Sequence, residues 1–274
     1  MYLKEQEFIK AALKEDIGRG DLFARISESK EVSGYIIAKS SGVFAGANYV
    51  EATKKLFDIN IELLVQDGDS FTAGDKLLTI SGNSKILLSL ERTLLNTILH
   101  ASSIATLTAE FVKKIAPYKV KLLDTRKTRP MLRELEKYAV RCGGGTNHRM
   151  GLDDCLMLKD THLKTIDNLN KFMQEVREKI PFTSKVEIEC ESFDMAKSAM
   201  EAGADIVMCD NMSLEETKKV VAFRDKNYSH ILIEASGNVT LDTIEEIAKC
   251  GVDAISSGST IHQSKWIDLS MKMD

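Results

Sequence analysis

The chain has 274 residues, 43% of them hydrophobic, and a formal net charge of −4 at pH 7, which suits one large or two modest α/β domains with filled cores. The slightly acidic balance excludes an overall basic field, so nucleic acid or an anionic membrane is not expected as the main partner and any anion site must be local. The charged opening sequence, the lack of an apolar run near the ~20 residues of a membrane span, and five cysteines without CxxC spacing predict a cytoplasmic protein with reduced core thiols.

The first hundred residues predict a small α+β domain. Residues 31–46 and 61–82 contain short runs rich in Val, Ile and Phe that are separated by Gly, Asp and Ser, which is typical of antiparallel strands joined by turns. A helix is expected between them, over residues 48–57. Residues 86–115 have a helical period and few breakers, so we expect two helices there that bridge the domains.

From residue 120 onward, apolar runs alternate with amphipathic stretches. The runs cover residues 120–123, 155–159, 185–190, 205–209, 231–236 and 253–258. This alternation predicts parallel strands with crossover helices, and runs that are apolar throughout indicate strands covered on both faces. Six such strands predict a barrel of the triosephosphate-isomerase type, complete or incomplete, although a doubly wound sheet has the same local pattern.

Cations follow the first of these predicted strands. In parallel α/β folds, functional residues gather beyond the carboxyl ends of the strands. Arg126 and Lys127 lie there, before a helix that Pro130 is expected to open. Arg133 and Lys137 fall on the polar side of that helix, and we expect them on a solvated face.

A second group of cations follows the triple glycine at residues 143–145, which lets the backbone pass close to a ligand. His148 and Arg149 come next and indicate an anion site. Lys159 ends the following strand, where it could extend to solvent, form a Schiff base with a carbonyl substrate or neutralise a phosphate. The two other groups of cations favour the phosphate.

Carboxylates end the next two strands. Glu187, Glu189 and Glu191 alternate, so they share one face of their strand and point into the barrel or toward its mouth. Because a buried charge is costly unless it is paired, we expect Glu187 to pair with a lysine or arginine of the barrel. Glu189 and Asp210 are better placed to hold Mg²⁺ or ribose hydroxyls.

The last two strands end in the Ser-Gly loops 234–238 and 256–260, the usual position of the phosphate site in such barrels. The ligand that would satisfy all these groups carries a phosphate, sugar hydroxyls with a divalent metal, and further anionic groups. It is similar to phosphoribosyl pyrophosphate together with an acid.

At this point a family resemblance becomes visible. It rests on residues 91–96, 124–162, 186–192, 203–213, 233–240 and 251–263. These segments resemble the quinolinate phosphoribosyltransferase family, the carboxylating nicotinate-nucleotide pyrophosphorylases, over nearly the whole chain. The resemblance implies transfer of phosphoribosyl from phosphoribosyl pyrophosphate to quinolinate with Mg²⁺. Pyrophosphate and CO2 are released, and nicotinate mononucleotide is formed for NAD synthesis.

The resemblance also implies an architecture and an assembly. Residues 1–103 would form an open α/β sandwich, joined by a C-terminal helix over residues 264–274, and residues 104–263 would form the α/β barrel. The family works as a homodimer that can assemble further to a hexamer, and each active site is completed by the neighbouring chain.

The family's site residues carry over as follows. Quinolinate would be held by Arg126, His148, Arg149 and Lys159, with Arg92 of the partner subunit. Lys127 would lie near the pyrophosphate, and Thr125 would also bind substrate. Glu189 and Asp210 would bind ribose hydroxyls and Mg²⁺. The 5′-phosphate would be bound by Ser236, Gly237, Asn238, Ser257, Gly258 and Ser259, with help from His262. The residues expected to take part in catalysis are Lys127, Lys159, Glu189 and Asp210.

Three positions depart from the family pattern: Thr161 stands in "KDTH" where "KDNH" is usual, Met131 stands where glycine is frequent, and "SSGST" replaces a sequence closer to "SVGAL". Three alternatives stay open. They are a paralogous phosphoribosyltransferase acting on another acid, a Schiff-base aldolase using Lys159, and a catalytically silent ligand-binding protein.

Overall fold

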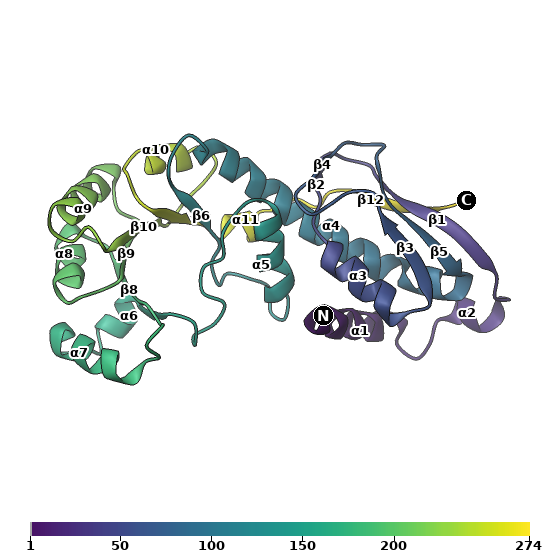
Figure 1. Ribbon diagram of the computed structural model, residues 1–274, viewed down its shortest axis with the longest axis horizontal. Helices are drawn as coiled ribbons and strands as arrows, with labels where there is room; N and C mark the ends of the chain where they lie inside the picture. Colours follow the sequence, from purple (N-terminus) through teal and green to yellow (C-terminus); the bar gives the residue numbers. More distant parts are fainter. Residues whose placement is uncertain (1) are drawn as a thin grey trace. The chain divides into compact units, whose positions relative to one another are not determined.

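The computed structural model describes residues 2–274, which fall into two compact units (Figure 1). Unit 1 comprises residues 2–109, Tyr138–Gly144 and Ser264–Asp274, and unit 2 comprises Glu110–Lys137 and Gly145–Gln263. Within the described residues, no helix is long and apolar enough to span a membrane.

Unit 1 is built on a four-stranded antiparallel sheet in the order β12-β1-β5-β3. The strands are β1 (Glu31–Ala38), β3 (Ile59–Leu63), β5 (Lys76–Asn83) and β12 (Leu269–Met273), with a separate pair β2 (Gly42–Val43) and β4 (Ser70–Phe71). Its helices are α1 (Leu3–Ile17), α2 (Leu22–Ile26), α3 (Ala47–Leu56) and most of α4 (Ser84–Ile115). The antiparallel strands and the helix expected over residues 48–57 are therefore confirmed.

The α4 helix differs from the sequence-based expectation, because residues 84–115 form one helix instead of two. This segment contains no glycine or proline, so nothing in the backbone interrupts the hydrogen-bond ladder. Leu87, Leu94 and Ile98 are fully or almost fully buried and supply its apolar face. The expected boundary between residues 103 and 104 falls inside this continuous helix.

The C-terminal segment is a strand, so the helix predicted over residues 264–274 is wrong. β12 pairs antiparallel with β1, with Gly34 opposite Met273 and Ala38 opposite Leu269. A Cβ atom at Gly34 would collide with the Lys272 carbonyl oxygen, so the glycine permits this close pairing. The segment is too short to show a helical period, and the unpaired edge of β1 decides its conformation.

Unit 2 contains a six-stranded parallel sheet in the order β6-β11-β10-β9-β8-β7. The strands are β6 (Lys121–Leu123), β7 (Leu156–Leu158), β8 (Val186–Cys190), β9 (Ile206–Asp210), β10 (Leu232–Ser236) and β11 (Ala254–Ser256). From β7 to β11 each strand neighbours its successor, and β6 pairs with β11. This is the order of a barrel that is open between β6 and β7, since a doubly wound sheet would reverse direction midway. The incomplete barrel is confirmed.

The helices of unit 2 follow the strands. They are α6 (Asp160–Leu163), α7 (Leu169–Lys179), α8 (Phe193–Glu201), α9 (Leu214–Asn227), α10 (Ile244–Ala248) and α11 (Ser259–His262), and α5 (Arg133–Cys142) spans the limit between the units. In Figure 1 α8 lies along the outer side of β8 and β9. Ser213 caps α9 by accepting a hydrogen bond from the backbone N–H of Glu216. The helices therefore cover the outside of the sheet and leave the strand ends to the loops.

The α5 helix begins at Arg133, three residues after Pro130. Met131 explains the delay, because its φ of 65° lies in the left-handed region and its side chain is 95% exposed. A residue with a Cβ atom adopts this conformation only at a cost. Glycine is frequent in the family at this position, and the backbone here is of the kind that favours glycine.

Candidate active site

The loop after β6 presents two exposed cations. Thr125 Oγ1 accepts a hydrogen bond from the Lys127 backbone N–H (3.0 Å), which shapes the loop. The side chains of Arg126 and Lys127 are exposed and form no hydrogen bond or ion pair within residues 2–274. Both charges are therefore available to an anion, as the sequence predicted.

Arg149 lies beside this loop and is held by its neighbours. Its Nη1 atom donates to the Cys155 carbonyl oxygen (3.0 Å), and its Nη2 atom contacts Met157 Sδ (3.4 Å). Burial lowers the pKa of Arg149, and the positive charge of Arg126 lowers it further. Two like charges that disfavour each other would be stabilised together by one bound anion.

A buried ion pair supports the loop that carries His148 and Arg149. Asp124 and Lys137 are both fully buried, and Lys137 Nζ donates to Asp124 Oδ1 and to the His148 carbonyl oxygen (3.0 Å). Asp124 also accepts from the His148 backbone N–H (2.8 Å) and from the Asn147 side chain. Burial raises the pKa of Asp124 and lowers that of Lys137, and the hydrogen bond between them opposes both shifts. His148 is thus held at both its N–H and its carbonyl.

The prediction that Arg133 and Lys137 lie on a solvated helix face is wrong. Lys137 is buried against Asp124, and Arg133 Nη1 donates to the Met150 carbonyl oxygen (3.0 Å). The helical period marks the apolar stripe correctly, but it cannot show a buried acid that arrives from a strand. Asp124 directly follows the apolar run at residues 120–123, and this position could have indicated a buried acid. The sequence analysis assigned it no partner.

The side chain of His148 points to two glutamates of the barrel. Its Nε2 atom lies 3.1 Å from Glu187 Oε2 and 3.3 Å from Glu234 Oε2, and both glutamates are almost fully buried. The expectation that Glu187 pairs with a lysine or arginine is wrong, because its partner is a histidine. The partner comes from a loop that follows the triple glycine, and strand periodicity carries no information about it.

In the described residues these three side chains are the one group of three or more His, Cys, Asp or Glu whose donor atoms lie close enough together to hold a metal ion. The His148 ring argues against that use. Its Nδ1 atom accepts a hydrogen bond from the Arg149 backbone N–H (2.7 Å), so the ring hydrogen must be on Nε2. An Nε2 atom that carries hydrogen has no lone pair for a cation, so the ring instead turns an N–H toward the two carboxylates.

The same cluster retains a proton at neutral pH. Burial lowers the pKa of His148, but Glu187 and Glu234 outweigh it and raise the pKa to about 10. Burial also raises the pKa of Glu187. Because Nδ1 accepts from Arg149, the ring hydrogen that faces the two glutamates is on Nε2.

Lys159 and Glu189 pair with each other. The sequence analysis expected Lys159 to bind an anion and Glu189 to bind Mg²⁺ or ribose hydroxyls. Lys159 Nζ lies 2.5 Å from Glu189 Oε2, with the lysine side chain 43% exposed and the glutamate largely buried. The Lys159 backbone N–H donates to His162 Nδ1 (3.0 Å), which fixes the lysine at the start of α6. The pair stands at the mouth of the barrel, on β8 and on the segment after β7.

Asp210 is linked to the first Ser-Gly loop through Asn211. Asn211 Nδ2 donates to Asp210 Oδ2 (2.9 Å), and Asn211 Oδ1 accepts from Asn238 Nδ2 (2.9 Å). Gly237 has a φ of 94°, and a Cβ atom there would collide with the Asn211 side chain. The carboxylate and the loop after Ser236 are therefore one connected structure.

The second Ser-Gly loop touches the first group of cations. A Cβ atom at Gly258 would lie 3.0 Å from Lys127 Cδ and 3.2 Å from Thr125 Oγ1, so only glycine fits without displacing them. The hydroxyls of Ser257 and Ser259 are buried 2.5 Å apart, and both lie near the Val239 carbonyl oxygen.

Two predicted residues stand apart from these contacts. His262 is exposed on α11, and Arg92 is exposed on α4 in unit 1. His148 and Arg149 lie in the loop between α5 and β7, and the other predicted residues of unit 2 lie at or shortly after the carboxyl ends of its strands. Their roles toward a ligand stay predictions.

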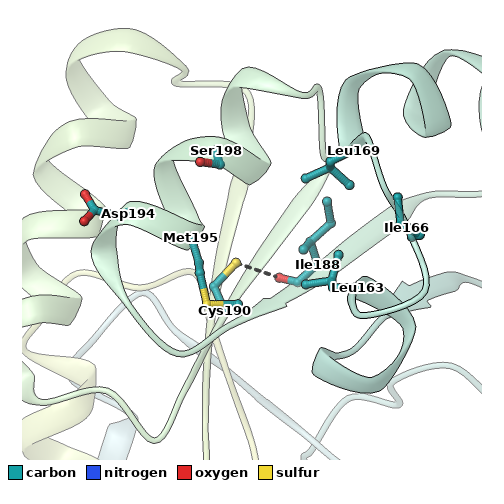
Figure 2. A pocket seen from close by; sticks show the side chains of 8 residues that line it. All are labelled: Leu163, Ile166, Leu169, Ile188, Cys190, Asp194, Met195 and Ser198. Carbon is teal, nitrogen blue, oxygen red and sulfur yellow. Dashed lines mark hydrogen bonds between the residues drawn. The ribbon is translucent and has the colours of Figure 1, made fainter.

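A separate pocket of ≈ 340 Å³ lies between α7, α8 and β8 (Figure 2). Its lining comprises Leu163, Ile166, Leu169, Ile188, Cys190, Asp194, Met195 and Ser198. Figure 2 shows the Cys190 thiol donating to the Ile188 carbonyl oxygen (3.6 Å) inside it. The lining is mostly apolar and contains none of the predicted site residues, so a polyanionic ligand is not expected there.

Comparison with known proteins matches this chain to two family models. The model for the quinolinate phosphoribosyl transferase N-terminal domain matches residues 21–102, and that for the C-terminal domain matches residues 104–272. A probable carboxylating nicotinate-nucleotide pyrophosphorylase of Synechocystis is 39% identical over 95% of this chain and 90% of its own length. A protein of the same name from Bacillus subtilis is 37% identical over 98% of this chain and 93% of its own.

Solved structures agree with these matches. The nicotinate-nucleotide pyrophosphorylase of Francisella tularensis has a TM-score of 0.93 and 35% identity, covering 100% of this chain and 97% of its own. A human nicotinic acid phosphoribosyltransferase has a TM-score of 0.64 with 13% identity, covering 98% of this chain and 73% of its own, a likeness of fold alone.

The buried ion pair gives a prediction about stability. Lys137→Ala should lower the free energy of unfolding by about 3–5 kcal/mol, because it leaves Asp124 buried without its counter-charge. Lys171→Ala is the matched control, since Lys171 is exposed on α7 and should change stability by about 0.5 kcal/mol at most. Urea unfolding followed by circular dichroism measures both. Similar midpoints for the two variants would contradict the buried pair.

Proposed function

Because this chain belongs to the quinolinate phosphoribosyl transferase family, we propose that its strand-end cations hold quinolinate beside the phosphoribosyl donor. The reaction transfers phosphoribosyl from phosphoribosyl pyrophosphate to quinolinate and gives nicotinate mononucleotide, pyrophosphate and CO2 for NAD synthesis. The observation that carries the proposal is the neighbouring pair Arg126 and Arg149, whose positive charges oppose each other unless an anion lies between them.

Quinolinate has two carboxylates on adjacent ring positions, and arginine side chains bind carboxylates through paired N–H donors. We assign Arg126 and Arg149 to these carboxylates, with Lys159 as a third cation. His148 was predicted to contact the acid directly. Both of its ring nitrogens already contact the chain, which favours an indirect role.

The donor side of the site is assigned to the loops after β6, β10 and β11. Lys127 would neutralise the pyrophosphate, and it approaches the Gly258 backbone. The loops 236–238 and 257–259 would take the 5′-phosphate, with His262 nearby in sequence. Such loops at the end of a barrel's last strands offer backbone N–H groups and hydroxyls to a phosphate.

Glu189 and Asp210 suit Mg²⁺ and the ribose hydroxyls. They offer carboxylate oxygens at the ends of the neighbouring strands β8 and β9, and these are the hard donors that Mg²⁺ prefers. One oxygen of Glu189 contacts Lys159, which leaves the other for a ligand. When bound, Mg²⁺ would neutralise part of the donor's negative charge.

The chain's residues then act by placement and by charge. Positive charge develops at the ribose as pyrophosphate leaves, and the carboxylates of Glu189 and Asp210 would stabilise it. Arg126 and Arg149 would hold the acid so that its ring nitrogen faces the ribose. The alkylated nitrogen is cationic, so it stabilises the negative charge left on the ring when the adjacent carboxylate departs as CO2. No step requires a nucleophilic side chain.

The aldolase alternative is not favoured. A Schiff-base lysine needs a free amine to attack a carbonyl, whereas the Lys159 Nζ atom is engaged by Glu189 Oε2 at 2.5 Å. A paralogue that acts on another acid would have no need for cations suited to two adjacent carboxylates. Quinolinate is therefore the substrate that best fits the chain.

We also propose that the active site is completed by a second copy of the chain. Arg92 lies on α4, whose buried face is made by leucines such as Leu94 and Leu95, yet Arg92 is exposed. Within the described residues its guanidinium forms no hydrogen bond or ion pair. An exposed, unpaired arginine on a rigid helix suits a substrate carboxylate in a neighbouring barrel. Assembly beyond the dimer and a cytoplasmic location stay predictions.

Quinolinate should be used in strong preference to nicotinate. A site with cations for two carboxylates is left with unpaired charge when one carboxylate is missing, and such discrimination can reach ~10⁴-fold. The measurement is formation of nicotinate mononucleotide from each acid with phosphoribosyl pyrophosphate and Mg²⁺. Comparable kcat/KM for the two acids would reject the assignment.

Arg126→Ala and Arg149→Ala should each reduce kcat/KM for quinolinate roughly 10- to 150-fold. Each removes charge-assisted hydrogen bonds worth about 1.5–3 kcal/mol. Arg19→Ala is the matched control, because Arg19 is exposed in unit 1 and its side chain forms no hydrogen bond or ion pair in the described residues. It should retain activity within about twofold. Equal losses in all three variants would show that the acid binds elsewhere.

The shared site can be tested by complementation. Arg92→Ala and Lys159→Ala should each be inactive as pure dimers, and mixing them should restore activity to roughly a quarter of wild type. About half of the dimers would be mixed, and each of these has one intact site of two. Subunit exchange is checked with differently tagged chains. Exchange without recovery would mean that Arg92 serves its own chain or none.

A further inference from the structure

We infer that Glu187 and Glu234 are positioning residues for this reaction, which hold the His148 ring inside the barrel so that His148 in turn holds Arg149. The inference rests on the proposed role of Arg149 in binding the acid. Glu187 and Glu234 would thus support the site without touching either substrate. His148 would act indirectly, through Arg149.

The first support is the burial of the two glutamates. Glu187 is 0% and Glu234 2% exposed, and in the described residues neither oxygen of Glu187 nor the Oε1 atom of Glu234 has a partner in hydrogen-bond geometry. Their Oε2 atoms both lie near His148 Nε2, at 3.1 and 3.3 Å. Apolar side chains of similar size would fill this space at lower cost, so the pair is not explained by stability alone. The imidazole is what the two carboxylates have in common.

The second support is the path from the ring to Arg149. His148 Nδ1 accepts from the Arg149 backbone N–H (2.7 Å), so the ring orientation fixes the backbone from which the guanidinium extends. That guanidinium is steadied by Cys155 and Met157. The backbone of His148 is held independently by Asp124 and Lys137. Only the ring orientation is therefore left to the two glutamates.

The chemistry of the cluster excludes the obvious alternatives. A metal ion would need the Nε2 lone pair, which carries hydrogen when Nδ1 accepts from Arg149. Direct contact of the glutamates with the acid would place like charges together, which is unfavourable. Holding an imidazole in one tautomer and orientation is the established use of a carboxylate beside a functional histidine.

The experiment compares Glu187→Gln, Glu234→Gln and His148→Asn with the control Glu178→Gln. Glu178 is an exposed glutamate on α7 whose side chain forms no hydrogen bond or ion pair in the described residues. Gln keeps the size and removes the charge. Loss of a group that orients a ligand-binding residue typically costs 10- to 100-fold. We expect KM for quinolinate to rise about 10-fold or more in both barrel variants, with KM for phosphoribosyl pyrophosphate and the melting temperature nearly unchanged. The control should match wild type.

A double-mutant cycle separates positioning from simple folding support. If the glutamates act through the ring, Glu187→Gln should add less than about twofold to the loss in a His148→Asn background. Additive losses, or equal increases in both KM values together with a lower melting temperature, would overturn the inference. Should Glu187→Gln fail to fold, Glu234→Gln gives the same comparison.

Long-range ¹H–¹⁵N spectra of the histidine rings, with His148→Asn for assignment, provide a readout that needs no activity. Wild type should show hydrogen on Nε2 and one set of sharp ring resonances. In the double Gln variant the ring resonances should shift and broaden, because only the Arg149 N–H still holds the ring. Resonances that stay as sharp and unshifted as in wild type would overturn the inference even if activity falls. If wild type forms no nicotinate mononucleotide, the proposed function fails, whereas the ring resonances still decide whether the glutamates hold His148.

Discussion

The buried pair of Asp124 and Lys137 is the interaction on which the rest of the site depends. It joins the end of β6 to α5 and holds the backbone of His148 on both sides. A buried ion pair contributes little net stability compared with apolar packing, but it allows few alternative arrangements when every polar atom has a partner. Here those partners are the backbone and side chains of the loop that delivers Arg149. The pair therefore determines where that loop can lie.

Around this loop the positive charges are exposed and the negative charges are buried. Arg126 and Lys127 are exposed at the mouth, while Glu187 and Glu234 are buried in the barrel. His148 lies at their contact, because one ring nitrogen meets the carboxylates and the other meets the backbone of Arg149. An anion that enters meets cations first. The carboxylates beneath are screened by a ring that carries a hydrogen toward them, so they can orient the site without repelling its ligand.

The departures from the family pattern affect the backbone more than the charges. Met131 adopts a left-handed conformation and is almost fully exposed, so the strain there is not balanced by side-chain packing. Ser257 and Ser259 direct their hydroxyls to each other and toward Val239. The loop can therefore be rigid before a phosphate arrives. Each charged position that the family resemblance implies is present.

The sequence by itself determined the strands, most of the helices and the cations at the strand ends, because local periodicity and turn residues act over a few positions. It also carried the motifs that place the chain in its family. The tertiary structure alone decided that Lys137 is buried, that Glu187 meets a histidine and that residues 269–273 form a strand. Each of these depends on a partner distant in sequence: Asp124 from β6, His148 from a glycine loop, and the free edge of β1. Such pairings are set by which elements meet in space, and no local pattern contains that information.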